Sequence, residues 1–258
     1  MNIPINNNST ARQTNSVTMR NDMIKSVKQD GTTLRYASDE LKKDKEIVLE
    51  AVKQNGCALE FASDALKNDR EFILEAVKQN GMALEYVPAD LNNDRDIVLE
   101  AVKQNGWALL YAPADLKIDR EIALEAVKQF GMALRFTSDA LKNDRGFILE
   151  VVKQNGKVLE YTSDELKNDK EIVLEAVKQF GMALCYASDA LKNNRDFILE
   201  AVNQNGLALQ YTSLELKNDR EIVLEAVKQN GWALLYAPAD LKNDKEFVRS
   251  CKKNPELK

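Results

Sequence analysis

Histidine is absent from this 258-residue sequence, which removes the commonest general base and the commonest metal ligand together. No apolar run approaches the roughly 18 residues that a membrane span requires, and no charged-then-apolar leader marks a secretory signal. Cysteine is scarce, and Cys57, Cys185 and Cys251 stand far apart with no C-x-x-C spacing. This odd, scattered set argues against a disulfide framework and indicates a reducing, cytoplasmic compartment.

An excess of positive charge is also lacking, because the formal net charge is −5. A nucleic-acid binder would need a basic stripe to displace counterions from phosphates. Acidic and basic residues alternate along the chain and form no blocks, which is typical of a solvated surface of mixed charge. We therefore expect neither a nucleic acid nor a membrane as partner.

Glycine is rare but strictly periodic. All but one of the ten glycines are spaced by 25 residues, and only Gly146 lies off this grid. The periodic glycines are Gly31, Gly56, Gly81, Gly106, Gly131, Gly156, Gly181, Gly206 and Gly231. Leucines follow each of them after three and after ten residues in all nine copies. Such a period indicates a repeat protein whose units cannot bury their apolar faces alone.

One unit reads D-R-E-I-V-L-E-A-V-K-Q-N-G-x-A-L-x-Y-A-S-D-x-L-K-N. The spacing of its apolar residues predicts an amphipathic helix over 70–80 with an N-cap at Asn68 or Asp69. We expect Gly81 to end this helix as a left-handed C′ residue. A second, shorter helix is predicted to begin at Met82.

These patterns predict an all-α fold, a solenoid of nine helix-pair repeats that forms one domain over residues 19–258. Both ends carry polar residues where inner repeats are apolar, namely Asp22, Ser26 and Thr33 at the start and Arg249 and Lys252 at the end. Polar end repeats of this kind cap a solenoid and oppose end-to-end stacking. We therefore expect a monomer.

Residues 1–18 have almost no apolar pattern and are predicted to be a disordered tail. Their Asn/Ser/Thr/Ile-rich composition also resembles the leaders of proteins that bacterial injection systems export. The composition of residues 1–18 fits both a plain disordered tail and an export signal.

The block L-E-A-V-K-Q-N-G-x-A-L-x-Y-A, at residues 99–112, resembles an uncharacterised family of tandem repeats. Members of that family carry repeats of about 25 residues and are found in protists and in bacteria that live inside other cells. The resemblance covers residues 19–258. It implies an α-solenoid and no activity, so it carries over no catalytic residues.

Carboxylate pairs such as Glu71 with Glu75 recur in most copies, whereas a catalytic site needs one distinct environment. We interpret them as a solvated helix face and predict no enzyme, no cofactor and no metal site. The glutamines equivalent to Gln54 form a second repeated row. They either bind an extended peptide or, as we favour, hydrogen-bond the loop of the adjacent repeat.

The positions one and four residues after each periodic glycine vary most. They accept Lys, Glu, Arg and Trp alike, so we expect them to be at least partly exposed. The candidate binding residues in this row are Trp107, Leu110, Met132, Arg135, Met182, Leu207, Trp232 and Leu235. Trp is enriched at interface hot spots. The alternative is that each tryptophan folds down over the neighbouring repeat.

The sequence thus predicts a non-enzymatic scaffold that binds a protein or peptide, with specificity set by the variable row. If the leader is an export signal, the partner belongs to a host cell. The alternatives are a nucleic-acid reader with one repeat per base and a purely structural spacer.

Overall fold

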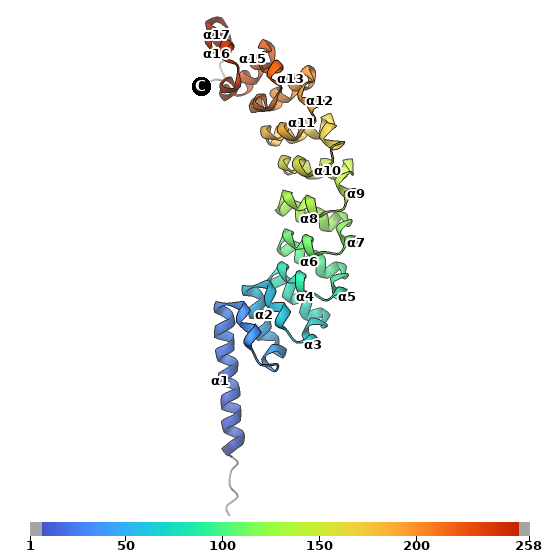
Figure 1. The fold of residues 1–258 in the computed structure, drawn as a ribbon, viewed down its shortest axis with the longest axis vertical. Helices are drawn as coiled ribbons and strands as arrows, with labels where there is room; N and C mark the ends of the chain where they lie inside the picture. The colour runs from blue at the N-terminus through green and yellow to red at the C-terminus, as the bar shows by residue number, and fades with distance from the viewer. Residues whose placement is uncertain (1–6, 253–258) are drawn as a thin grey trace, which may run out of the picture. The chain divides into compact units, whose positions relative to one another are not determined.

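The computed structural model describes the backbone of residues 7–252 and the side chains of residues 15–251. Within these residues every regular element is helical, and the fold is an all-α solenoid of tandem repeats, as the periodicity predicts (Figure 1). The chain divides into two compact units, Met1–Phe136 and Thr137–Lys258, which are described separately.

Each repeat consists of a long α-helix, a 3₁₀ helix and a short helical turn. In the first unit the long helices are α1 (Asn7–Gln29), α2 (Lys45–Gln54), α4 (Arg70–Gln79), α6 (Arg95–Gln104) and α8 (Arg120–Gln129). The 3₁₀ helices are η1 (Gly31–Tyr36), η3 (Gly56–Phe61), η4 (Gly81–Tyr86), η5 (Gly106–Tyr111) and η6 (Gly131–Phe136). The short turns are η2 (Leu41–Lys43), α3 (Asp64–Lys67), α5 (Ala89–Asn92) and α7 (Ala114–Lys117).

The second unit repeats the pattern. Its long helices are α10 (Arg145–Val152), α11 (Lys170–Gln179), α13 (Arg195–Gln204), α15 (Arg220–Gln229) and α17 (Lys245–Lys252). Its 3₁₀ helices are η7 (Gly156–Tyr161), η9 (Gly181–Tyr186), η10 (Gly206–Tyr211) and η11 (Gly231–Tyr236). Its short turns are α9 (Asp139–Lys142), η8 (Leu166–Asn168), α12 (Asp189–Lys192), α14 (Leu214–Lys217) and α16 (Ala239–Asn243).

In both units long helices pack on long helices and 3₁₀ helices pack on 3₁₀ helices, so each unit has two layers with the core between them. We call these layers the long-helix row and the 3₁₀ row. In α4 the core side is formed by Phe72, Ile73, Ala76 and Val77, all buried. These four residues form the stripe that the sequence predicts.

The N-terminal helix corrects the expected disorder of residues 1–18. Helix α1 begins at Asn7, so residues 7–18 are helical, while residues 1–6 lie outside the described part. Helix α1 contains neither glycine nor proline. Its C-terminal half packs on α2, with Val27 buried and Arg20 bonded to Asp44. Because propagating a helix costs much less than nucleating one, this docked half supports the polar half before it.

The periodic glycine has a different role from the predicted left-handed cap. No described residue has a positive φ, Gly81 included. The last residue of α4 is Gln79, and Asn80 after it is extended. The Asn80 side chain accepts a hydrogen bond from the Met82 amide and so caps the start of η4. A Cβ on Gly81 would lie 2.2 Å from the Ala101 carbonyl oxygen in the next long helix. Glycine is therefore required by the close approach of two backbones.

Ion pairs join the long helices along their N-terminal ends. Arg95 donates to Asp119, the N-cap of α8, at 2.8 Å and also pairs with Glu121. The same link starts from Arg20, Lys45 and Arg70 in the first unit and from Arg145, Arg195 and Arg220 in the second. Sequence reasoning treated these aspartates only as caps and missed the link, which joins residues 24 apart.

The glycine contact predicts that Gly81→Ala destabilises the protein by about 2 kcal/mol or more, since overpacked contacts cost about 1–3 kcal/mol. Urea denaturation followed by circular dichroism measures this change. Gly146→Ala is the matched control, because a Cβ there meets only the Asp144 side chain at 3.3 Å and lies inside α10. Replacing a helical glycine should stabilise the protein by about 0.5 kcal/mol. Equal stability changes in Gly81→Ala and Gly146→Ala would contradict the role of Gly81 in this backbone contact.

The ion pairs predict a loss of stability in acid. Hydrogen bonds from Arg70 and Arg95 are the largest cause of the lowered pKa values of Asp94 and Asp119. Stability from these pairs is therefore fully present above the ordinary pKa of 3.8 and is lost as the pH falls through the lowered folded-state value. We expect the thermal midpoint to fall below about pH 4, and to fall less in Arg95→Gln. Identical acid profiles for the two proteins would contradict the role of the pair.

Candidate functional site

The variable row lies on the 3₁₀ helices. It comprises the residues one and four positions after each periodic glycine, which fall in η1, η3 to η7 and η9 to η11. None of these residues is buried, as their variability predicts. The frame beneath them is largely buried, since the alanine or valine two residues after the glycine is at most 1 % exposed and most of the following leucines have no exposed surface. Thr33 in the first copy and Leu234 in the last are partly exposed. The row therefore varies at the surface of a nearly constant support.

The first tryptophan of the row is packed. The Trp107 ring lies 5.5 Å from the Phe136 ring and 6.0 Å from the Phe130 ring, measured between centroids. Both phenylalanines belong to the next repeat, so Trp107 folds down over its neighbour. Leu110, three residues later, is 42 % exposed. Met132 and Arg135 on η6 are exposed as well.

The second tryptophan is open to solvent. Trp232 is 72 % exposed, and Leu235 beside it on η11 is 61 % exposed. The two Trp/Leu pairs have the same sequence spacing but different environments. Trp107 has Phe130 and Phe136 to cover it, and no described ring contact involves Trp232.

A groove of about 310 Å³ lies in the 3₁₀ row of the second unit, and Tyr236 of η11, the helix that also carries Trp232 and Leu235, contributes to its lining. Its apolar and aromatic lining consists of Phe180, Met182, Leu207, Tyr211 and Tyr236. The structure thus brings together two predicted residues, Met182 and Leu207, that lie one repeat apart. None of the residues lining this groove is charged, although 30 % of the chain is. We call it the η9–η11 groove.

The edge of the η9–η11 groove is polar. Gln210 lines the groove and is exposed. The Lys157 ammonium on η7 lies 5.0 Å from the Phe180 ring centroid, so one face of that ring already attracts a cation. Gln179 and Asn205 complete the polar lining.

Two tyrosines of the 3₁₀ row, Tyr111 and Tyr186, have raised pKa values. Burial, with a hydrogen bond to Glu160, raises the pKa of Tyr186 to about 12. Burial also raises the pKa of Tyr111, helped by Glu85. These hydroxyls act as hydrogen-bond donors that link neighbouring 3₁₀ helices, and sequence reasoning did not identify this role. Because their pKa values are raised, hardly any phenolate is present near neutral pH, so these tyrosines are poor candidates for a general base.

The glutamine row is structural at several copies, as favoured from the sequence. The Gln129 amide accepts from the Gly106 N–H at 2.9 Å and donates to the carbonyls of Val102 and Lys103. Gln104 and Gln229 accept from the periodic glycine of the preceding repeat in the same way. Because these amides already have partners, they are not free to bind a peptide backbone.

Two features were also sought among the described residues: a cluster of metal ligands and a membrane-spanning helix. No group of three or more Cys, Asp or Glu side chains gathers there in a way that could hold a metal ion. Within residues 7–252, none of the helices combines the length and apolar character that crossing a membrane requires.

The contrast between the two tryptophans predicts different costs of truncation. Trp107→Ala should destabilise the protein by about 2 kcal/mol because it empties an aromatic cluster. Trp232→Ala should change stability by less than about 0.5 kcal/mol. Fluorescence offers an independent check: with Trp232 replaced by Phe, the remaining emission should be blue-shifted and protected from acrylamide. Equal quenching in the two single-tryptophan variants would show that the environments do not differ.

A family described as a domain of unknown function (DUF4116) matches residues 20–67, 69–117, 119–167, 144–192, 169–217, 194–241 and 219–256. Each match spans about two of the 25-residue units, and together they cover most of the chain. No curated protein and no solved structure matches it. The chain therefore belongs to the DUF4116 family of tandem helical repeats.

Proposed function

We propose that this protein is a non-enzymatic scaffold that binds a protein or peptide through the 3₁₀ row of its second unit. The observation that supports this function is the uncharged η9–η11 groove, together with the exposed Trp232 and Leu235 on η11, the helix that contributes Tyr236 to the groove. Exposed apolar surface with a polar edge is typical of interaction sites. Tryptophan and tyrosine are also the residues that most often supply binding energy at interfaces.

The groove is sized for a small part of a partner. A volume of about 310 Å³ accommodates one or two apolar side chains and not a whole helix. Trp232 and Leu235 extend the apolar surface along η11, which packs on η10. We therefore propose a partner segment whose apolar side chains enter the groove and cover Trp232.

The repeat architecture favours this function over the two alternatives. A nucleic-acid reader would present cations in the variable row, but exposed glutamates occupy it at Glu60, Glu85 and Glu160. A purely structural spacer would pack its variable row, whereas Trp232 and Leu235 remain exposed. Surface variation on a constant frame is the means by which solenoids acquire specificity.

A role in a host cell is a separate hypothesis that depends on the composition of residues 1–18. If those residues direct export, the scaffold would act on a host protein. Fusing residues 1–18 to a translocation reporter tests this without reference to the groove. A reporter that stays inside the bacterium would reject the export hypothesis and leave the binding function untouched.

Affinity capture from cell lysate followed by mass spectrometry tests the binding function. We expect Met182→Glu combined with Leu207→Glu to lose specific partners, because the groove then carries two charges. Trp232→Ala should weaken capture, with helicity unchanged in both variants by circular dichroism.

Leu214→Ser is the matched control, since Leu214 is 80 % exposed but lies on α14, outside the groove. It should retain every partner. If the groove variants and the control capture the same proteins, the 3₁₀ row of the second unit is not the binding surface.

A further inference from the structure

The ion-pair link between long helices is interrupted once in the second unit. The N-cap of α13 is Asn194, where α11, α15 and α17 begin after Asp169, Asp219 and Asp244. Asn194 still caps the helix, because its side-chain oxygen accepts from the Phe197 amide at 2.9 Å. What the substitution removes is the negative charge alone.

The cation that would pair with this cap is Lys170, the first residue of α11. Its counterpart Lys45 bonds Asp69 at 2.7 Å, so a lysine at this position reaches the cap of the next helix. Arginines here reach two carboxylates because the guanidinium presents a broad fork, whereas an ammonium is a single point. Among the residues that the structure describes, Lys170 forms no ion pair, and Asp196 does not replace the missing partner.

A second charge partner is missing from the same helix. In α6 and α15 the glutamate of the long helix pairs with a lysine three residues later, Glu100 with Lys103 and Glu225 with Lys228. Helices α2, α4, α8 and α11 carry the same lysine, although the described residues show no such pair there. In α13 that lysine is Asn203, and its last turn carries no basic residue. Glu200 makes no ion pair in the described part of the chain. One repeat has therefore lost one carboxylate and one ammonium.

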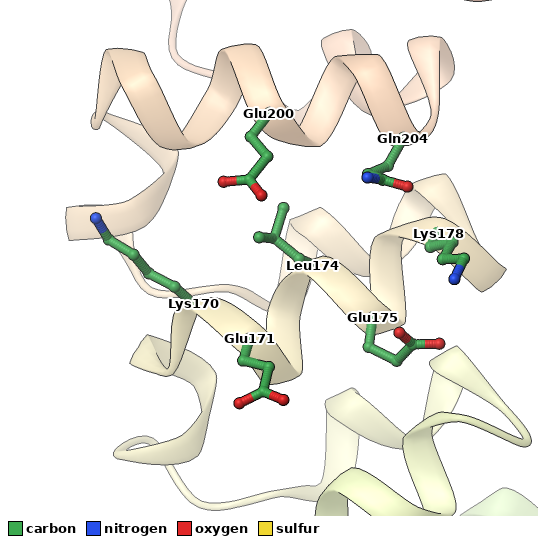
Figure 2. A pocket seen from close by; sticks show the side chains of 7 residues that line it. All are labelled: Lys170, Glu171, Leu174, Glu175, Lys178, Glu200 and Gln204. Carbon is green, nitrogen blue, oxygen red and sulfur yellow. The ribbon is translucent and has the colours of Figure 1, made fainter.

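The two unpaired groups line one groove. A groove of about 410 Å³ lies between α11 and α13 and is lined by Lys170, Glu171, Leu174, Glu175, Lys178, Glu200 and Gln204. Figure 2 shows Lys170 and Leu174 rising from α11 and Glu200 and Gln204 descending from α13 toward the same space. Glu171 points to the opposite side, where it pairs with Arg145. We call this the α11–α13 groove.

We propose that the α11–α13 groove binds a peptide segment of a protein partner in which an acidic and a basic side chain flank an aliphatic residue. The two absent partners define the chemistry, since other repeats supply an aspartate to the first position and a lysine to the second. The acidic group pairs with Lys170, the basic group pairs with Glu200, and the aliphatic side chain covers Leu174. This site lies on the long-helix row and shares no residue with the η9–η11 groove.

The test uses the full chain and synthetic peptides that carry Asp, Leu and Lys with one to four residues between the charges. Binding is followed by shifts of backbone amide signals in nuclear magnetic resonance titrations. We expect the best-spaced peptide to shift amides of residues 170–178 and 196–204 in a saturable way. The same peptide with Asn and Gln in place of Asp and Lys should bind about tenfold more weakly, since each exposed ion pair changes affinity by up to about fivefold.

Asn194→Asp with Asn203→Lys restores the internal partners and should weaken binding of the charged peptide by about tenfold. Both residues are the ones that other repeats carry, so folding is preserved. Leu214→Asp with Asn243→Lys makes the same charge changes outside the groove and should leave binding unchanged. Absence of saturable shifts, equal binding of the neutral peptide, or full binding by the restored variant would each overturn the proposal.

Discussion

The close contact between a periodic glycine and the next long helix, found at Gly31, Gly81, Gly106, Gly156 and Gly206, is the constraint on which the fold depends. In the Gly81 copy the glycine Cα approaches the Ala101 carbonyl so closely that a single added methyl would overlap it. Its N–H is bonded by Gln104 from the same neighbouring helix. In this copy the close backbone contact and the hydrogen bond from the glycine to the glutamine side chain thus lie at the same point. Because this contact recurs in five of the copies, it fixes the spacing between the repeats that it joins.

The charged network has a different physical character from this contact. Its ion pairs lie at the surface, where long side chains are partly hydrated and salt screens them. They set the alignment of neighbouring helix N-termini more than the overall stability. A repeat can therefore lose a pair without losing the fold, as Asn194 shows by retaining its cap. Surface charges can therefore vary between repeats without loss of the fold, whereas a glycine held in a close backbone contact cannot be replaced in this way.

Sequence periodicity predicts the helices well because burial has the same period. The apolar stripe of the long helix and its aspartate cap follow from local pattern, and the helix ends at Gln79, one residue before the predicted end at Asn80. The conformation of Gly81 could not be predicted, since glycine suits both a left-handed cap and a close backbone approach. Residues 7–18 were also misjudged. Their composition is polar, but the docked half of α1 supports them, and that support depends on packing against α2.

The candidate site was predictable only in part. Variation correctly identified the exposed 3₁₀ row, yet it could not distinguish Trp107 from Trp232, because the difference depends on which rings lie one repeat away. The η9–η11 groove likewise combines residues from neighbouring repeats. The loss of charge at Asn194 and Asn203 was visible in the sequence. Its meaning emerged only when the structure showed that their former partners, Lys170 and Glu200, face one groove.

The central claim is that each repeat is stable only when it packs against its neighbours. Circular dichroism of two fragments tests it most directly: a 25-residue peptide covering residues 69–93 and a longer chain covering residues 1–136. If each repeat depends on its neighbours, the short peptide should show little helix and no cooperative thermal transition, while the longer chain unfolds cooperatively. A short peptide that is helical and melts cooperatively as a monomer would contradict the account, because the repeats would then be independent of the contacts between them.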